Sequence, residues 1–173
     1  MMDGRVTAAG FAHTTLDTPI GPLLVAATAR GIVRIAFESE DFDTVRGALA
    51  TRLGPPGLPG PAGLDDAIRQ LGEYFAGTRT RFDLPLDLTL SGGFQEAVQR
   101  ELLRIEPGHT RSYAEVAARV GNPRAVRAVG RACATNPLPV VVPCHRVLRA
   151  DGGLGGYRGG LEAKRALLAL EGG

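Results

Sequence analysis

Residues 112–134, SYAEVAARVGNPRAVRAVGRACA, contain two short helical patterns separated by a small polar turn. Ser112 is a typical N-cap for a first helix through Val120, and Gly121-Asn122-Pro123 would end it and open a second helix through Ala134. Two helices at this spacing are typical of a helix-turn-helix motif, whose basic second helix, residues 124–134, would be the recognition element. Any small helical domain contains similar turns, so the pattern alone is weak evidence.

Further helical patterns flank this stretch. Apolar side chains at helical spacing predict a helix that Pro107-Gly108 ends: Phe94, Val98, Leu102 and Ile105. A last helix is predicted over residues 161–170. Between these helices, the apolar run 138–142 predicts a buried strand, and a Gly-rich stretch follows it.

The first half of the chain has a different pattern. Residues 14–39 alternate β-branched and small side chains around two turn signals, which predicts a strand meander. Asp41 is a candidate cap for a helix over residues 42–53, and a second helix is predicted over residues 64–76. The Gly- and Pro-rich residues 54–63 between them predict a surface loop.

Residues 79–90 alternate like an edge strand and lead into Ser91-Gly92-Gly93, a candidate linker. We therefore expect two domains, residues 1–90 and residues 91–173.

The composition is ordinary for a soluble globular protein: 173 residues, 44% hydrophobic and 22% charged. The first fifteen residues hold no apolar stretch of signal-peptide length, and no segment approaches the roughly 18 apolar residues of a membrane span. We expect a cytoplasmic protein without a membrane partner. Cys133 and Cys144 form no CxxC pair, so we expect thiols rather than a disulfide.

Charge is distributed unevenly along the chain. Residues 1–90 carry 8 basic and 11 acidic side chains, whereas residues 91–173 carry 12 basic, all but one of them arginine, and 7 acidic. Because the planar guanidinium suits phosphates and base edges, the second half is the candidate surface for an anionic partner. A GC-rich coding sequence would give the same arginine bias, so nucleic-acid binding and composition bias both stay open.

The strongest candidate for chemistry is residues 140–147, VVVPCHRV, an apolar run that stops at a proline and then presents Cys144 and His145. A thiol where a strand ends is a candidate nucleophile. Pro143 favours the first position of a helical turn, which would place Cys144 near free backbone N–H groups that lower the pKa of a thiol. The alternative is a buried structural cysteine, the commoner role of this residue type.

The adjacency of Cys144 and His145 argues against a cysteine hydrolase. Neighbouring side chains point apart, so we expect His145 to reach the thiol only through a water or another group. A metal site is poorly supported as well, because Cys133, Cys144 and His145 lack the paired spacing of metal ligands.

Two more motifs complete the pattern. Asn136-Pro137 lies upstream of Pro143-Cys144-His145-Arg146-Val147, and Gly156-Tyr157-Arg158-Gly159-Gly160 lies downstream. Together with residues 124–130, RAVRAVG, these motifs resemble those of the O6-alkylguanine-DNA alkyltransferases, also called methylated-DNA:protein-cysteine methyltransferases. The resemblance covers most of residues 94–171 and extends more loosely to residues 18–23 and 74–77.

The resemblance implies an α/β (α+β) fold, with an RNase-H-like N-terminal domain followed by a winged helix-turn-helix C-terminal domain. It implies direct-reversal DNA repair, in which a methyl or other alkyl group moves irreversibly from O6-alkylguanine in double-stranded DNA to Cys144. The protein would act once, as a monomer, without cofactor or metal. Preference among alkyl groups, activity on O4-alkylthymine and cooperative binding along DNA stay open.

The catalytic roles of the family map onto five residues. Cys144 would attack the alkyl carbon, His145 would activate the thiol through a water, and Glu171 would hold the imidazole in the right tautomer. Asn136 would brace the turn beside the site, and Tyr113 would donate to guanine N3. Without the resemblance, Glu171 would be a solvated residue near the chain end and Tyr113 a packed aromatic.

Contacts to DNA and to the base follow in the same way. A protein sulfur cannot approach guanine O6 in line within a duplex, so the base would be flipped out through the minor groove, with Arg127 taking its place. The residues expected at the DNA and the base are Gln95, Asn122, Arg127, Ala128, Val147, Tyr157, Arg158 and Gly159. Without the resemblance, residues 124–134 would be a solvated helix and residues 151–160 a mobile hairpin.

Other functions stay open beside this one. A binding module that flags lesions, or a DNA-binding regulator, would be expected to lack the acceptor cysteine, which this chain keeps. A thiol hydrolase would have to show turnover. Cys133 is expected to be structural, and Gln99, where many members of the family carry tryptophan, is expected to alter packing rather than chemistry.

Overall fold

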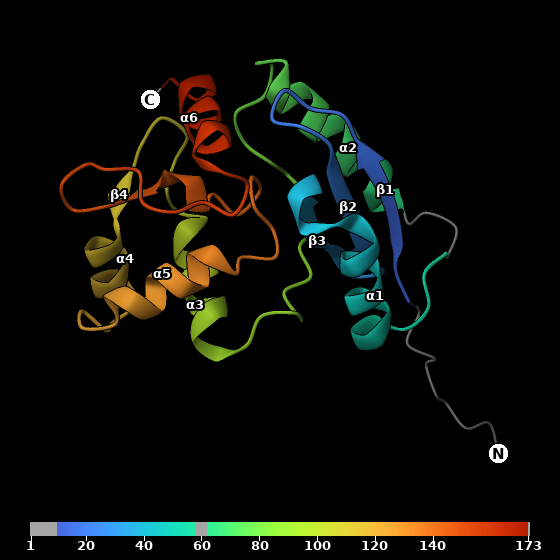
Figure 1. Ribbon diagram of the computed structural model, residues 1–173, viewed down its shortest axis with the longest axis horizontal. Helices are drawn as coiled ribbons and strands as arrows, with labels where there is room; N and C mark the ends of the chain where they lie inside the picture. The colour runs from blue at the N-terminus through green and yellow to red at the C-terminus, as the bar shows by residue number, and fades with distance from the viewer. Residues whose placement is uncertain (1–9, 58–61, 173) are drawn as a thin grey trace.

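The computed structural model describes residues 10–57 and 62–172 (Figure 1). The N-terminal part contains an antiparallel sheet in the order β1-β2-β3, formed by β1 (Ala12–Leu16), β2 (Leu23–Thr28) and β3 (Gly31–Phe37). The predicted strand meander is thus confirmed. Of the predicted Gly- and Pro-rich loop, residues 58–61 lie outside the described residues.

Two helices cover opposite faces of this sheet, because alternate residues of a strand point to opposite sides. Leu23, Val25 and Ala27 of β2 belong to the same apolar cluster as buried side chains of α2 (Ala62–Phe75), whereas Leu24 and Ala26 pack with those of α1 (Phe42–Leu53). Both helices were predicted within two residues of their observed bounds.

The predicted cap of α1 is wrong in its chemistry. Asp41 precedes α1, after a short 3-10 turn η1 (Glu38–Glu40), but it has a φ of 62° and its side chain accepts no backbone hydrogen bond. Its carboxylate instead accepts from the hydroxyl of Thr44 at 2.7 Å. The position of Asp41 before an apolar helical pattern therefore predicted where the helix begins but not how its first N–H groups are capped.

Residues 79–90 are not the continuous edge strand that alternation predicted. A single bridge joins Leu86 to Ile32 in β3: the Ile32 amide donates to the carbonyl of Pro85 at 2.9 Å, and the Asp87 amide donates to the carbonyl of Ile32 at 2.8 Å. Pro85 has no N–H to extend the ladder. Gly31, at a φ of 142°, permits this approach, because a Cβ there would lie 2.3 Å from the Pro85 carbonyl oxygen.

The C-terminal part is helical, as predicted. Its elements are α3 (Gly93–Leu102), α4 (Tyr113–Arg119), α5 (Val126–Ala134) and α6 (Leu161–Leu170), with a short parallel pair, β4 (Arg111–Ser112) and β5 (Val147–Leu148). Among the described residues, no helix has the length and hydrophobicity needed to cross a bilayer.

The turn between α4 and α5 is longer than expected. Ser112 caps α4 as predicted: the Glu115 amide donates to its hydroxyl at 3.0 Å, and the Glu115 carboxylate accepts from the Ser112 amide at 3.2 Å. However, α5 begins at Val126 rather than at Pro123. Residues 121–125 instead form consecutive turns in which the Ala125 amide donates to the carbonyl of Asn122 at 3.0 Å.

The predicted buried strand 138–142 is wrong in type, although all five residues are buried. The segment is a run of turns in which the Val142 amide donates to the carbonyl of Leu138 at 2.8 Å, and Val140 has a φ of 75°. A short apolar run cannot distinguish a strand from any other buried segment. The segment packs against the sheet, and just before it the carbonyl of Pro137 accepts a hydrogen bond from the Ile35 amide at 2.8 Å.

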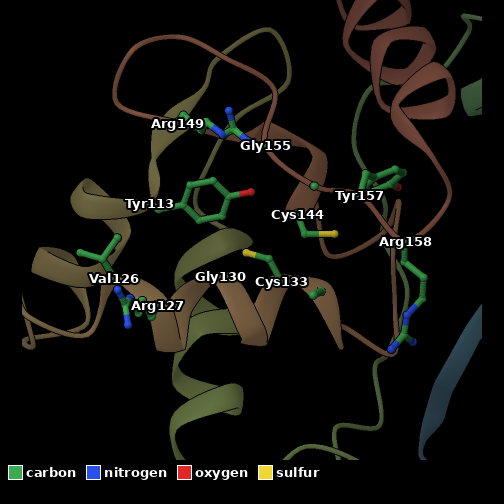
Figure 2. A pocket seen from close by; sticks show the side chains of 12 residues that line it. Tyr113, Val126, Arg127, Gly130, Cys133, Cys144, Arg149, Gly155, Tyr157 and Arg158 are labelled. Atoms are coloured by element: carbon green, nitrogen blue, oxygen red, sulfur yellow. The ribbon is translucent and has the colours of Figure 1, made fainter.

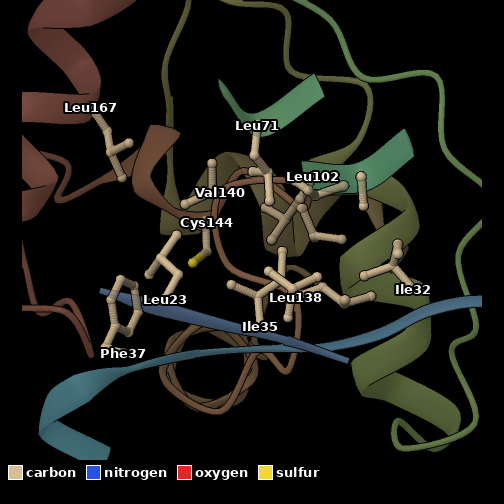
Figure 3. Packing of buried hydrophobic residues seen from close by; sticks show 14 of the residues in the cluster. Leu23, Ile32, Ile35, Phe37, Leu71, Leu102, Leu138, Val140, Cys144 and Leu167 are labelled. Carbon is tan, nitrogen blue, oxygen red and sulfur yellow. The ribbon is translucent and has the colours of Figure 1, made fainter. Parts of the chain in front are cut away.

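One apolar core joins both parts of the molecule. Figure 3 shows Leu23 and Ile35 of the sheet, Leu102 of α3 and Leu138 in the same cluster as Cys144. The cysteine therefore lies where the two parts meet, and side chains from both can reach its surroundings.

Candidate active site

The backbone around Cys144 is a tight turn followed by one turn of 3-10 helix, η2 (Cys144–Arg146). Pro143 has φ −81° and ψ 64°, and the Cys144 amide donates to the carbonyl of Val142 at 2.8 Å, which is the geometry of an inverse γ-turn. Pro143 is thus the residue before the helical turn rather than its first residue. Cys144 is only 4% exposed.

Cys144 lies in the wall of a cavity of about 610 Å³, a size typical of small-ligand sites (Figure 2). The other lining residues come from α4, α5 and the Gly-rich segment after β5: Tyr113, Val126, Arg127, Gly130, Cys133, Ala134, Arg149, Gly155, Gly156, Tyr157 and Arg158. Both cysteines are free thiols, as predicted, and both line this cavity.

The thiol of Cys144 is neutral in the resting protein. Burial raises its pKa above the ordinary value, and the Asn136 amide and the charge of Lys164 oppose this rise only in part. The expectation of a lowered pKa is therefore wrong, because the site is more thoroughly desolvated than the position after a proline suggested. A nucleophile here needs a base that removes its proton during the reaction.

His145 is placed to supply that base. Its Nε2 lies 3.0 Å from both carboxylate oxygens of Glu171, so Nε2 carries the ring proton and Nδ1 is left as an acceptor. Nδ1 is buried and has no hydrogen-bond partner among the described residues. Burial lowers the pKa of His145, although Glu171 opposes this, so the ring is neutral and ready to accept a proton near pH 7.

Glu171 is held by side chains from both parts of the molecule. Arg146 donates from Nε at 2.8 Å and from Nη2 at 2.6 Å, and the hydroxyl of Tyr74 in α2 donates at 2.7 Å. Burial alone would raise the pKa of Glu171, but these hydrogen bonds and that of His145 lower it to about 2. Glu171 is a buried carboxylate, not the solvated residue that its position near the chain end suggested.

Asn136 braces the turns that lead to Cys144. Its side-chain Nδ2 donates to the carbonyl of Val142 at 2.9 Å, and its Oδ1 accepts from the Leu138 amide at 3.0 Å. Gln99 in α3, which we expected only to alter packing, also lies 3.4 Å from Asn136 Oδ1 through its Nε2. Through its hydrogen bonds to Val142 and Leu138, the Asn136 side chain thus holds residues 136–142 together.

Lys164 is a residue whose role the sequence did not indicate. It is fully buried in α6, and its ammonium donates to the carbonyls of Val147 at 2.8 Å, Gly156 at 3.3 Å and Leu154. Leu154 and Gly156 lie within the Gly-rich segment, and Val147 lies in β5 before it. Lys164 therefore fixes the segment that forms one wall of the cavity, and its charge favours the thiolate form of Cys144.

We predict that Lys164→Met opens this wall. The substitution keeps the aliphatic volume and leaves the three carbonyls without their donor, which should lower the free energy of unfolding by about 2 kcal/mol. Urea unfolding followed by circular dichroism measures this change. The exposed neighbour Arg165→Met is the control and should change stability by no more than about 0.5 kcal/mol. Equal effects of both variants would contradict the prediction.

The remaining cavity residues come from three directions. Tyr113 faces the Gly-rich segment, where a Cβ at Gly155 would lie 2.7 Å from its hydroxyl, and Arg127 lies next to Val126 at the start of α5 (Figure 2). Arg158 donates to the Glu40 carboxylate at 3.0 Å, which joins the cavity rim to the N-terminal part. The ring of Tyr157 packs edge-on against that of Phe37 at 5.6 Å between centroids.

The structure brings only some of the predicted DNA and base residues to the cavity. Arg127, Tyr157 and Arg158 line it, whereas these predicted residues do not: Gln95, Asn122, Ala128, Val147 and Gly159. Gln95 donates to Thr135 at 2.8 Å, Val147 is fully buried in β5, and Gly159 packs against the ring of Phe37. Asn122 is exposed in the turn before α5.

Three residues of this site were missed as functional residues in the sequence. Arg146, Tyr74 and Lys164 all lie within the stretches that resemble the family, but the sequence alone indicates no role for them. Arg146 follows the Cys-His pair, and an arginine beside a candidate base could have suggested a carboxylate partner. For Tyr74, 97 residues from Glu171, the sequence holds no such signal.

Comparison with known proteins finds the same protein family for both parts of the chain. Residues 12–88 match the family model of the 6-O-methylguanine DNA methyltransferase ribonuclease-like domain, and residues 93–173 match that of the DNA binding domain. The methylated-DNA–protein-cysteine methyltransferase of Mycobacterium bovis is 42% identical over 92% of this chain and 91% of its own length. The constitutive enzyme of Bacillus subtilis is 42% identical over 92% of this chain and 94% of its own.

Solved structures agree with these matches. The Mycobacterium tuberculosis O6-methylguanine methyltransferase superposes with a TM-score of 0.79 at 42% identity, covering 93% of this chain and 92% of that one. A structure of the M. tuberculosis protein in complex with DNA gives a TM-score of 0.78 at 42% identity, with 92% of each chain covered. The predicted fold class is confirmed. The chain therefore belongs to the 6-O-methylguanine DNA methyltransferase family.

Proposed function

We propose that this chain repairs O6-alkylated guanine in DNA by transferring the alkyl group to its own Cys144. The observation that carries the assignment of the acceptor is the geometry around one thiol: Cys144 lines a ligand-sized cavity, and Glu171 fixes the neighbouring imidazole, whose other nitrogen has no partner in the described part of the chain. Cys133 lines the same cavity, but no histidine lies next to it in the sequence.

The reaction begins with a neutral Cys144 and a neutral His145. The thiol proton passes to Nδ1 of His145 through a water, because the side chains of two neighbouring residues point apart. The Glu171 carboxylate stabilises the resulting imidazolium. The sulfur attacks the alkyl carbon, the S–C bond forms as the C–O6 bond breaks, and guanine leaves. Because the thioether is stable, each molecule acts once.

Tyr113 assists the departure of guanine. Its hydroxyl borders the cavity opposite Cys144 and would donate to N3 of the purine as negative charge develops there. Burial raises the pKa of Tyr113, and the nearby Arg149 opposes this rise, so the phenol stays protonated and remains a donor. Guanine takes up one proton from the solvent, and the His145 imidazolium releases to the solvent the proton that the thiol has lost.

The DNA partner of this reaction is a duplex whose damaged base has been flipped into the cavity. Arg127 in α5 lies at the cavity rim and is exposed, as a side chain that fills the vacated place in the stack must be. The basic balance of residues 91–173 supports phosphate contacts on this side.

We further propose that the protein acts as a cytoplasmic monomer with the domain boundary near residue 90.

Intact-mass spectrometry tests the proposed function. After incubation with a duplex containing one O6-methylguanine, the protein should gain a single methyl group, about 14 Da, that maps to Cys144. An unmodified duplex is the control. Binding without a mass change would indicate a damage reader, and repeated turnover of a small ester or thioester would indicate a hydrolase; either result would overturn the proposal.

We predict that Arg127→Ala affects duplex repair more than repair of single strands. A base already outside a duplex needs no partner to replace it in the stack, so the rate should fall about 10- to 100-fold for duplex and only a few-fold for single-stranded O6-methylguanine DNA. Single-turnover kinetics on both substrates measure the ratio. Arg69→Ala, on the exposed face of α2, is the control; the same loss on both substrates would contradict a role in flipping.

A further inference from the structure

Two buried polar atoms next to Cys144 have no hydrogen-bond partner among the described residues. One is Nδ1 of His145, and the other is the hydroxyl oxygen of Tyr157. Tyr157 lines the same cavity wall as Cys144, on the Gly-rich segment that Lys164 fixes (Figure 2). A buried hydroxyl without a partner costs free energy, so its position beside another unpaired atom requires an explanation.

Packing explains the ring of Tyr157 but not its hydroxyl. The edge-on contact with Phe37 and the apolar neighbours in the core would be made equally well by phenylalanine. The hydroxyl lies in the field of Cys144, Tyr74 and Glu171, and burial together with these groups raises its pKa. It is therefore a protonated donor that feels the charges of the site.

We infer that the Tyr157 hydroxyl is the third partner of the water that carries the proton from Cys144 to His145. This inference rests on the proposed function. A buried water binds about three polar groups. Here the thiol of Cys144 and the hydroxyl of Tyr157 donate to its two lone pairs, and the water donates to Nδ1 of His145, so one water gives a partner to both His145 Nδ1 and the Tyr157 hydroxyl.

This arrangement gives Tyr157 a positioning role rather than a catalytic one. With both lone pairs of the water engaged, one of its hydrogens is directed at His145. As the thiol proton moves to the water, a water proton moves to Nδ1, and the sulfur is left as the thiolate that attacks the alkyl carbon. Tyr157 keeps its own proton throughout, consistent with its raised pKa.

Tyr157→Phe in a Cys133→Ser background, where Cys144 is the only thiol, tests the inference. The rate of methyl transfer and the rate of iodoacetamide labelling should both fall at least about 10-fold near pH 7.5, because the proton leaves the thiol less readily. The Kd for the damaged duplex, measured with Cys144→Ala added to prevent transfer, should stay within about two-fold. A loss in Kd instead of rate would contradict a role in the relay.

Two further results separate this role from a structural one. If the hydroxyl is simply unsatisfied, Tyr157→Phe will raise the melting temperature and leave both rates unchanged, which would overturn the inference. Phe37→Leu loosens the ring packing and keeps the hydroxyl, so an equal loss of both rates in that variant would overturn it as well. Absence of transfer by the parent protein would instead overturn the proposed function.

Discussion

Cys144→Ala should reduce methyl transfer by at least about 10³-fold while the variant still binds the damaged duplex. The loss is expected to be this large because the thiol forms the new bond itself, and Cys133, the other thiol of the cavity, has no histidine next to it in the sequence. Alanine is a conservative choice for the fold, since the side chain lies in an apolar cluster and the Asn136 amide keeps its hydrogen bond to the carbonyl of Val142. Intact mass gives the transfer, and fluorescence anisotropy of a labelled duplex gives the binding.

Cys133→Ala is the matched control for this experiment. Cys133 lines the same cavity, and burial also raises the pKa of its thiol, but no histidine lies next to it in the sequence to take its proton. Transfer should therefore persist at the parent rate. Retained transfer in Cys144→Ala with loss in Cys133→Ala would assign the acceptor to α5 and contradict the proposed mechanism.

Local sequence signals predicted the existence of the helices well, because the apolar face of each helix lies within its own stretch of sequence. Ser112 and Glu115 form the capping box that their spacing indicated, and α6 has the bounds that its apolar pattern gave. The two wrong strands have a common physical cause. Residues 79–90 alternate apolar and polar side chains and residues 138–142 are apolar, but the backbone hydrogen bonds are decided by distant partners such as Ile32 and by the Asn136 side chain.

The site was predictable only in part for the same reason. Cys144 and His145 follow from one local motif, whereas the role of Glu171 depended on the family resemblance, since nothing near residue 171 indicates burial. The contact of Tyr74 with Glu171 spans 97 residues. The lowered thiol pKa was wrong because a local turn cannot reveal how completely the rest of the fold desolvates it.

Glu171→Gln should have the largest effect on stability, because it removes the charge that compensates a buried arginine. Arg146 is 6% exposed, and its guanidinium donates twice to Glu171 and once to the carbonyl of Ile105 at 2.5 Å. Breaking a buried pair on one side typically costs about 3–5 kcal/mol. We expect a loss of about 3 kcal/mol in the free energy of unfolding and a fall of about 100-fold in transfer, since the His145 imidazolium loses its counter-charge.

Glu106→Gln provides the control for the loss of one carboxylate. Glu106 pairs with Arg81 at 3.2 Å, but both side chains are more than half exposed, so the change should be no more than about 0.5 kcal/mol. Urea unfolding of the parent and of both variants at pH 7 measures the difference. A similar, small loss in both variants would show that the Glu171 cluster contributes no more than a surface pair.

The pH dependence of the free energy of unfolding gives an independent check of how much the Glu171 carboxylate contributes to stability. Its pKa is about 2 in the folded protein and 4.5 when unperturbed, so its stabilising contribution is complete above about pH 4.5 and is lost as the pH falls toward 2. Glutamine cannot take up this proton, so the difference in stability between the parent and Glu171→Gln should narrow over that range. His145, whose pKa is lowered by burial, adds a separate loss that begins below pH 6.5, because unfolding lets the ring take up a proton. A difference that stays constant from pH 7 to pH 3 would show that Glu171 stabilises the fold by its shape and not by its charge.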